Sequence, residues 1–346
     1  MSSKTIHRAD SEELRLALEQ ELSLHLQAVR RVVKLHRHVS AYSSSCTIEN
    51  LGVELDNGQR LQLVLKDLSP ASLLATARKV RPHFLYHPRR EVETYRNLLN
   101  PQRLGTATCF GAVNSVELER YWLFLERVKG PLLWQMGRIE SWELAARWLA
   151  RLHSDFNAPK HPQSSDRFAH LLHYDEGFYW MWLRQAEDLL RHKRVRTSPE
   201  SRRGFGRLAS HYDRVVTRLM ELPRTFIHGE FYPSNVILRA TTEGRRVCPI
   251  DWEVAGVAPG LIDLAALTSG KWKNEQKVAM VAAYREALKP TKNWPPSLAD
   301  LLEAVDYCQL HLSVQMLGWA SDWSPPAQHA QNWLREACRL AHGLGL

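Results

Sequence analysis

The sequence lacks the features that mark membrane-spanning and disulfide-stapled chains. No stretch of its 346 residues approaches the roughly 20 consecutive apolar residues that span a bilayer. Residues 1–10 lack the basic and then apolar order of a secretory signal. The five cysteines form no Cys-x-x-Cys spacing, which argues against a disulfide framework and a structural zinc site. These absences predict a soluble, cytoplasmic protein that has no membrane partner.

The sequence also lacks internal repeats, low-complexity tracts and a Walker A pattern. Its content of 44% hydrophobic and 24% charged residues is that of an ordinary globular chain. The length exceeds a typical single core, so we expect two domains or two lobes of one fold. Any nucleotide must be bound by a route other than a Walker A loop.

Positive charge exceeds negative charge, with a formal net charge of +9. Such a balance suits nucleic acid or a phosphate-bearing small ligand. The clustering is modest, and a solvated helix end and loop explain the densest run better than a nucleic-acid surface does. That run contains Arg191, Lys193, Arg194, Arg196, Arg202, Arg203 and Arg207.

The first half of the chain is predicted to be rich in short strands. Asp10 and Glu13 form a capping box before leucines at helical spacing, which predicts an opening helix to about Arg31. A further helix is predicted over residues 90–99. The β-prone segments are 32–40, 46–55, 61–68, 108–113 and 121–128, with a turn at 56–58.

After Gly130 and Pro131 the pattern becomes helical. Helical segments are predicted over 141–153, within 161–201 and as two helices over 301–341. Short β-prone segments lie at 225–228, 236–239 and 247–252. We therefore predict an α+β fold with an N-terminal lobe of residues 1–129 and a C-terminal lobe of residues 130–346.

The segment from His228 to Asn235 and the following Asp251 carry the chemistry. If residues 236–239 and 247–250 pair as a hairpin, Asn235 lies close to Asp251 at the strand ends. An amide oxygen and a carboxylate are ligands that suit Mg²⁺. Glu230, on the connecting loop, can face the same point and accept a hydroxyl proton or orient the attacking oxygen.

Simpler interpretations exist for each residue taken alone. An Asp or Asn beside a strand is commonly a turn or capping group. The His228-x-Glu230 spacing also occurs in zinc deaminases, but that chemistry needs a later Cys-x-x-Cys, and the only nearby thiol is Cys248. The combination with Asn235 and Asp251 favours the magnesium site.

These residues resemble the aminoglycoside phosphotransferase and choline kinase-like family, distant relatives of protein kinases, over about residues 35–270. The family carries a His-Gly-Asp-x-x-x-x-Asn loop and an Ile-Asp strand end. Here His228, Gly229, Asn235 and Asp251 match, whereas Glu230 stands where Asp is usual. The resemblance implies a two-lobed protein-kinase-like fold: an N-terminal antiparallel sheet with a helix, and a mainly helical C-terminal lobe with a catalytic hairpin. It further implies ATP, with GTP not excluded, and Mg²⁺ as cofactors.

The strand that ends at Lys66 resembles the phosphate-binding lysine strand of the same family. Either Glu91 or Glu93 on the following helix could pair with this lysine. Their directions differ by roughly 200° at 3.6 residues per turn, so only one can face it. Resemblance to the Arg-Glu pattern of the family favours Glu91.

Two further segments are candidates for nucleotide binding. Ser43, Ser44 and Ser45 take the place where kinases carry glycines, although an ordinary polar turn explains them equally well. The segment with Glu126 and Val128 resembles the hinge, whose backbone would hydrogen-bond adenine.

Two residues of the second half are interpreted as structural. Asp263 matches a family position and is expected to act as an anchor at the start of a helix. His153, at the end of a helix, is expected to be a packed or capping residue rather than a catalyst.

Three functions remain open from the sequence. The first is a small-molecule kinase that transfers the γ-phosphoryl group to a hydroxyl. The second is a nucleotide-binding pseudokinase or regulatory scaffold, because Glu230 is longer than Asp, and the third is a basic nucleic-acid-binding protein. Residues after Val254 balance Lys and Arg against Asp and Glu, which favours a neutral or anionic acceptor over a polycation. Stacking surfaces for such an acceptor could come from Trp272, Trp294, Trp319, Trp323 and Trp333.

Overall fold

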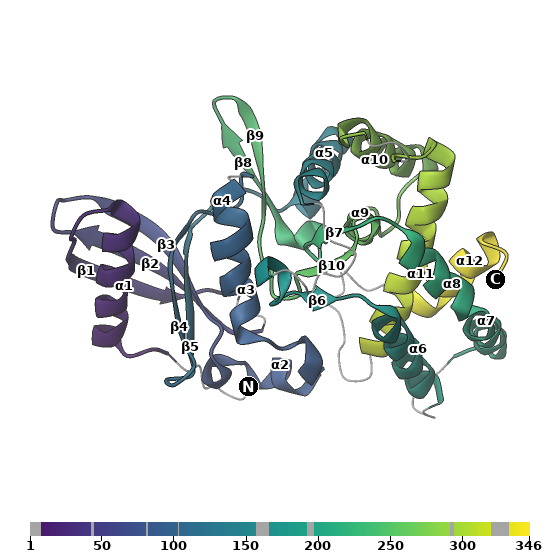
Figure 1. The fold of residues 1–346 in the computed structure, drawn as a ribbon, viewed down its shortest axis with the longest axis horizontal. Helices are drawn as coiled ribbons and strands as arrows, with labels where there is room; N and C mark the ends of the chain where they lie inside the picture. The colour runs from purple at the N-terminus through teal and green to yellow at the C-terminus, as the bar shows by residue number, and fades with distance from the viewer. Residues whose placement is uncertain are drawn as a thin grey trace. The chain divides into compact units, whose positions relative to one another are not determined.

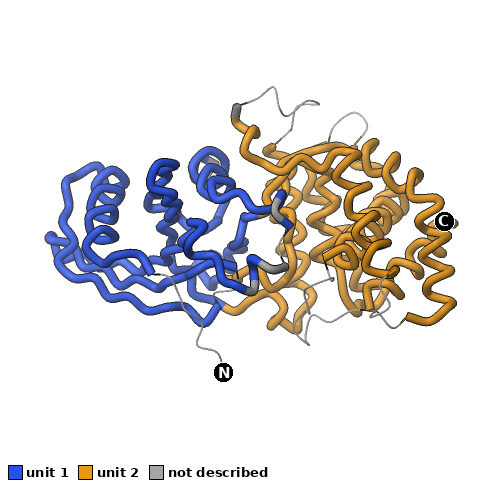
Figure 2. The backbone as a smooth tube through the Cα atoms, turned by 90° about the horizontal axis from the view of Figure 1, so that it is seen from below, with its two compact units in different colours: residues 1–130, 239–253 blue, residues 131–238, 254–346 orange. Residues whose placement is uncertain are grey.

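The computed structural model describes residues 8–42, 45–80, 82–102, 104–156, 166–191, 197–290, 294–319 and 332–346. The chain forms two compact units (Figure 2). Unit 1 comprises residues 1–130 and 239–253, and unit 2 comprises residues 131–238 and 254–346. The sequence prediction drew a single boundary after residue 129, whereas the segment 239–253 groups with unit 1.

Unit 1 is built on a five-stranded antiparallel sheet of order β1-β2-β3-β5-β4 (Figure 1). The β2–β3 connection turns at Gly58, whose φ of +80° suits glycine. Alternation of apolar side chains gives the sheet one face for a core. The strands are β1 Val32–Val39, β2 Thr47–Leu55, β3 Arg60–Asp67, β4 Cys109–Ser115 and β5 Arg120–Glu126.

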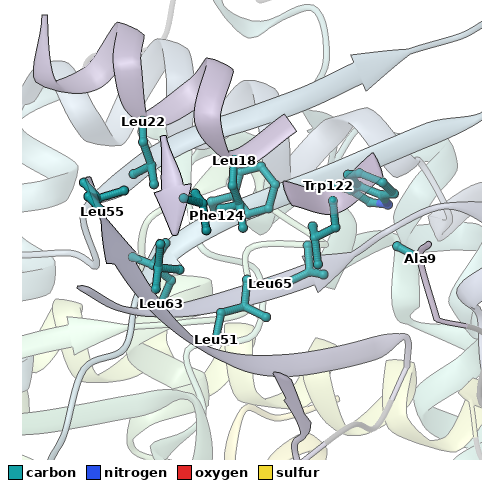
Figure 3. Packing of buried hydrophobic residues seen from close by; sticks show 12 residues of the cluster. Ala9, Leu18, Leu22, Leu51, Leu55, Leu63, Leu65, Trp122 and Phe124 are labelled. Carbon is teal, nitrogen blue, oxygen red and sulfur yellow. The ribbon is translucent and has the colours of Figure 1, made fainter. Parts of the chain in front are cut away.

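Helix α1, Ser11–Leu26, packs its leucine stripe onto this sheet (Figure 3). The Asp10 side chain caps the helix by accepting hydrogen bonds from the backbone N–H groups of Glu12 and Glu13. The helix ends at Leu26 rather than near Arg31, because Gln27 adopts the left-handed conformation with φ 53°. The buried leucines of α1 are Leu14, Leu18 and Leu22, which pack with Leu51, Leu63, Leu65 and Phe124 of the sheet.

We expect Leu18→Ala to lower the free energy of unfolding by about 2–5 kcal/mol, because it removes a fully buried side chain from this core. Leu16→Ala on the same helix is the matched control, since Leu16 is 53% exposed. Its effect should stay within about 0.5 kcal/mol. Chemical denaturation of the two variants measures the difference, and equal effects would show that α1 does not pack on the sheet.

The remaining elements of unit 1 are short helices and strand β9. Strand β9, Gly244–Pro249, pairs with β8, Val236–Thr241, and the unit boundary falls inside β8. Arg246 and Arg239 pair with Glu126 at the end of β5, with Arg246 Nη2 2.8 Å from Glu126 Oε2. These ion pairs are among the contacts that join the segment 239–253 to the rest of unit 1. The helices are α2 Ala75–Val80, α3 Pro88–Thr94 and α4 Asn100–Gln102, with a π-helical turn at Tyr95–Leu99 between the last two.

Unit 2 is mainly helical around a small sheet of order β6-β10-β7 (Figure 1). Its strands are β6 Leu172–His173, β7 Arg224–Ile227 and β10 Gly256–Pro259. No described helix is long and apolar enough to cross a membrane. The helices are α5 Ile139–Asp155, α6 Glu176–Arg191, α7 Pro199–Ser210, α8 Tyr212–Glu221, α9 Leu261–Leu267, α10 Asn274–Ala287, α11 Leu298–Trp319 and α12 Trp333–Gly343.

Candidate active site

Three carboxylates of unit 1 converge on the ammonium of Lys66, which is buried on β3. Its Nζ lies 2.6 Å from Glu91 Oε2 and 2.6 Å from Asp251 Oδ1. The third carboxylate, Glu253, has Oε1 2.9 Å from the same nitrogen. Glu91 is therefore the helix partner of Lys66, as favoured from the sequence, whereas Glu93 bonds to other residues of unit 1.

This cluster carries more negative than positive charge. Burial opposes the charge on Lys66, but the nearby carboxylates outweigh burial and hold the pKa of the ammonium well above its ordinary value. Burial raises the pKa of Glu91, and the other carboxylates add to that rise against the attraction of Lys66. The carboxylates therefore stabilise the ammonium form of Lys66, and the cluster favours the approach of further positive charge.

The chain after β9 is held in place by Glu91. Its Oε1 accepts a hydrogen bond from the backbone N–H of Trp252 at 3.1 Å. Asp251 has a φ of +70°, an unusual conformation for a residue other than glycine that Asp tolerates better than most. With Trp252 fully buried between them, Asp251 and Glu253 both present their carboxylates to Lys66.

The same carboxylates fit a divalent cation. Oxygens of Glu91, Asp251 and Glu253 lie within 4.8 Å of one another. Hard cations such as Mg²⁺ take oxygen ligands, but Lys66 Nζ lies 2.6–2.9 Å from all three carboxylates, so a cation at this point would have to displace the ammonium. Sequence reasoning named only Asp251 of these three as a ligand. The signal for Glu253 was its position two residues after Asp251, on the same strand end.

The serine loop is only partly described. Ser43 and Ser44 lie outside the described residues. Ser45 Oγ donates a hydrogen bond to Glu253 Oε1 at 3.3 Å. Its hydroxyl thus contacts the carboxylate cluster.

The expected hinge has its backbone groups engaged within unit 1. The N–H of Glu126 donates to Thr108 O at 2.8 Å, and the N–H of Val128 donates to Glu126 O at 3.0 Å. The carboxylate of Glu126 accepts from Arg246, which helps to hold its pKa below the usual range against the effect of burial. The backbone N–H of Val128 is therefore already bonded within unit 1.

In unit 2, Asp263 anchors the loop that follows β7. This fully buried residue of α9 accepts hydrogen bonds from the N–H groups of His228 at 2.7 Å and Gly229 at 2.9 Å. His153 packs behind it, with Nε2 3.4 Å from Asp263 Oδ2 and Nδ1 2.9 Å from the hydroxyl of Tyr284. Asp263 thus has the anchoring position expected from the sequence, and His153 is a packed residue.

The loop conformation at Gly229 requires glycine. Its φ is +85°, and a Cβ there would lie 2.4 Å from the carbonyl oxygen of Val254. The next residue, Glu230, donates its backbone N–H to His228 Nδ1 at 3.3 Å. The backbone at Glu230 is therefore held independently of its side chain.

Asn235 closes the same loop. Its Nδ2 donates to the carbonyl oxygen of Glu230 at 3.0 Å, and its backbone N–H donates to the carbonyl oxygen of Tyr232 at 2.8 Å. Because the amide nitrogen bonds within the loop, the side-chain oxygen is the atom suited to a cation. Asn235 belongs to unit 2 and Asp251 to unit 1, so each is described within its own unit.

Sequence reasoning missed a cavity of about 320 Å³ in unit 2. Tyr232 of the loop lines it together with side chains from α10, α11 and α12. Two of the tryptophans named as possible stacking surfaces, Trp272 and Trp333, are among the lining residues. No motif indicated the cavity, because its lining residues are spread from Tyr232 to Arg339 without a fixed spacing.

Comparison with known proteins places this chain among phosphotransferases. A model of the phosphotransferase enzyme family (APH) matches residues 48–299, so the chain belongs to this family. No similar sequence was found among curated proteins.

Solved structures similar to this chain have low sequence identity. The choline kinase from Cryptosporidium parvum is 12% identical, with 90% of this chain and 88% of the other covered and a TM-score of 0.55. The choline kinase LicA from Streptococcus pneumoniae is 15% identical, with 96% and 99% covered and a TM-score of 0.53. The ADP-bound aminoglycoside phosphotransferase APH(2'')-Ib is 14% identical, with 96% and 98% covered and a TM-score of 0.53. These similarities show that the chain has the two-lobed kinase-like fold expected from the sequence.

Proposed function

We propose that this protein transfers the γ-phosphoryl group of ATP to a hydroxyl of a small molecule in a reaction that depends on Mg²⁺. The observation that carries the proposal is the buried Lys66, whose ammonium binds Glu91 and also Asp251, a residue that follows β9. A lysine that is held by a helix glutamate and adjoins a metal-binding aspartate is the arrangement used by kinases to position phosphates. Membership of a phosphotransferase family supports the same conclusion.

Each candidate residue has a role in this proposal. Lys66 positions nucleotide phosphates, and Glu91 orients Lys66. Asp251 and Asn235 supply oxygen ligands to Mg²⁺, which when bound offsets the negative charge of the phosphates. Glu230 accepts the hydroxyl proton of the acceptor or orients its oxygen.

A nucleotide titration combined with turnover tests the proposal. ATP with Mg²⁺ should raise the melting temperature, since a ligand that binds only the native state stabilises it. Hydroxyl compounds should then produce ADP release above the rate with ATP alone. Stabilisation without ADP release for any acceptor would indicate the pseudokinase, and stabilisation by RNA or DNA but not by ATP would indicate a nucleic-acid-binding protein.

We expect Lys66→Met to be destabilised in the absence of metal, because it leaves three buried or half-buried carboxylates without their cation. Mg²⁺ should raise the melting temperature of this variant more than that of the parent, since the cation replaces the ammonium. ATP turnover should fall strongly in kcat/KM. Differential scanning fluorimetry with and without Mg²⁺ measures the first effect, and Lys34→Met, an exposed lysine of β1, is the control. An identical response to Mg²⁺ in both variants would contradict a cation site at these carboxylates.

A further inference from the structure

The cavity of unit 2 begins beside the loop that carries Glu230. Tyr232, two residues after Glu230, lines the cavity, and its backbone N–H donates to the carbonyl oxygen of Glu230 at 2.6 Å. The cavity volume of about 320 Å³ lies at the lower end of the roughly 300–1,000 Å³ typical of small-molecule sites. The cavity therefore has the size and the position within unit 2 to hold the acceptor of the proposed reaction.

The charged residues that line the cavity are balanced and paired with one another. Lys277 Nζ lies 2.5 Å from Asp306 Oδ1 and 2.8 Å from Gln309 Oε1. Arg339 Nη2 lies 2.6 Å from Glu336 Oε1. Among the described lining residues, each carboxylate thus has a cation beside it.

An aromatic wall accompanies these paired charges. The indole of Trp272 is held by a hydrogen bond from its Nε1 to Ser269 O at 3.2 Å. It also packs edge-on against Trp142, with ring centroids 4.4 Å apart. A ring that is held on two sides offers an ordered apolar surface to a ligand at little entropic cost. Trp333 of α12 contributes a second indole.

We infer that the acceptor is an uncharged polyhydroxyl compound of the size and chemistry of a small sugar or polyol. The inference rests on the proposed function. A cationic ligand would have to compete with Lys277 and Arg339 for the two carboxylates, and an anionic ligand would have to compete with the carboxylates for the cations. Hydroxyl groups can accept from the ammonium and donate to the carboxylates while both ion pairs persist. The C–H face of a sugar ring can pack on the Trp272 indole.

This chemistry differs from that named for the similar structures. Choline is a quaternary ammonium ion and aminoglycosides are polycations, so unpaired negative charge beside the ligand favours both. In the cavity of unit 2, Lys277 occupies the position beside Asp306 that such a cation would need. The paired charges therefore act against cationic acceptors as well as in favour of neutral ones.

Turnover and binding measured on one set of compounds test the inference. Glucose, ribose and glycerol serve as neutral probes, and choline, ethanolamine and kanamycin serve as cationic probes, in coupled ADP detection with the parent protein. We expect ADP release with at least one neutral probe and none above background with the cationic ones. Release with a cationic probe alone would overturn the inference and leave the proposed function intact.

Variants of the cavity identify where the probe binds. Trp272→Ala should raise the KM for the neutral probe by about tenfold with kcat little changed, on the scale of a lost aromatic contact of about 1.4 kcal/mol. Trp134→Ala is the matched control, because Trp134 is 43% exposed in the same unit and does not line the cavity. Equal KM values for Trp272→Ala and the parent would overturn the assignment of this cavity.

A charge variant tests why cations are excluded. Lys277→Met leaves Asp306 without its ammonium, so choline binding by titration calorimetry should become measurable in this variant and stay undetectable in the parent. Lys271→Met, an exposed lysine outside the cavity, should behave as the parent does.

Neutral probes that bind in a Trp272-dependent manner without any ADP release would support the assignment of the cavity and contradict the proposed kinase activity. Failure of all three neutral probes to bind the parent would overturn the inference.

Discussion

Asp251→Ala is expected to lower kcat by about a thousandfold or more, the scale for removing preorganised charge that stabilises a transferring phosphoryl group. Asp251 follows β9, and its carboxylate accepts a hydrogen bond from Lys66 Nζ. Without it Lys66 keeps Glu91 and Glu253, so the cluster retains paired charges. Because the Asp251 side chain is 29% exposed, its loss leaves no closed cavity. The melting temperature should change little while ADP release nearly disappears at saturating ATP and Mg²⁺.

Two further variants test whether the loss of turnover is specific to the carboxylate of Asp251. Asp56→Ala removes an exposed carboxylate from the β2–β3 turn of the same unit and should leave turnover unchanged. Asp251→Asn keeps the shape and one oxygen ligand but loses the charge, so its activity should lie between those of Asp251→Ala and the parent. Turnover of Asp251→Ala within a few-fold of the parent would show that Asp251 does not bind the metal.

The β-rich first half could be predicted because its strands obey a simple local rule. Strand β2 is the clearest case, with a regular alternation of buried and half-buried residues, whereas the interior of β5 is buried throughout. The grouping of 239–253 with unit 1 could not be predicted in this way. It rests on contacts between residues far apart in the sequence, such as those of Arg239 and Arg246 with Glu126, which precedes both arginines by more than 110 residues.

The short elements of unit 2 show a second limit. Strand β10 has four buried residues and pairs with β6 in parallel and β7 in antiparallel orientation. A short apolar run has no period that separates strand from helix, so only its partners reveal what it is. Sequence reasoning accordingly predicted β7 and missed both β6 and β10.

Parts of the candidate site could be predicted where helix geometry or a motif indicated which side chains converge. Their angular separation on a helix allowed only one of Glu91 and Glu93 to face Lys66, and resemblance to the Arg-Glu pattern of the family favoured Glu91. The structure pairs Glu91 with Lys66. Glu253 was missed as a member of the cluster, since its convergence depends on the left-handed backbone at Asp251. The position of Glu253 two residues after Asp251 was a signal, but the left-handed backbone that lets both carboxylates reach Lys66 was not visible in the local sequence.

Glu230→Gln is expected to lower kcat by about a hundredfold or more while ATP affinity stays close to that of the parent. The substitution removes a proton acceptor and keeps the size of the side chain. The loop should survive, because the backbone N–H of Glu230 bonds to His228 and its carbonyl oxygen accepts from Tyr232 and Asn235. Titration calorimetry with ATP and ADP release on the same variant separate binding from chemistry.

Glu230→Asp tests whether the longer side chain at this position supports or impairs catalysis. Glutamate places its carboxylate about 1.5 Å further from the backbone than the aspartate usual in the family, about one carbon–carbon bond. Phosphoryl transfer passes through a loose transition state with little early demand for proton removal, so a displaced carboxylate can still orient the hydroxyl. If the rest of the site is adapted to glutamate, Glu230→Asp should be slower than the parent and faster than Glu230→Gln. Glu221→Gln, on the exposed end of α8, controls for the change of charge. Equal turnover in the parent and Glu230→Gln would remove Glu230 from the mechanism, whereas an inactive parent that gains activity as Glu230→Asp would identify a pseudokinase.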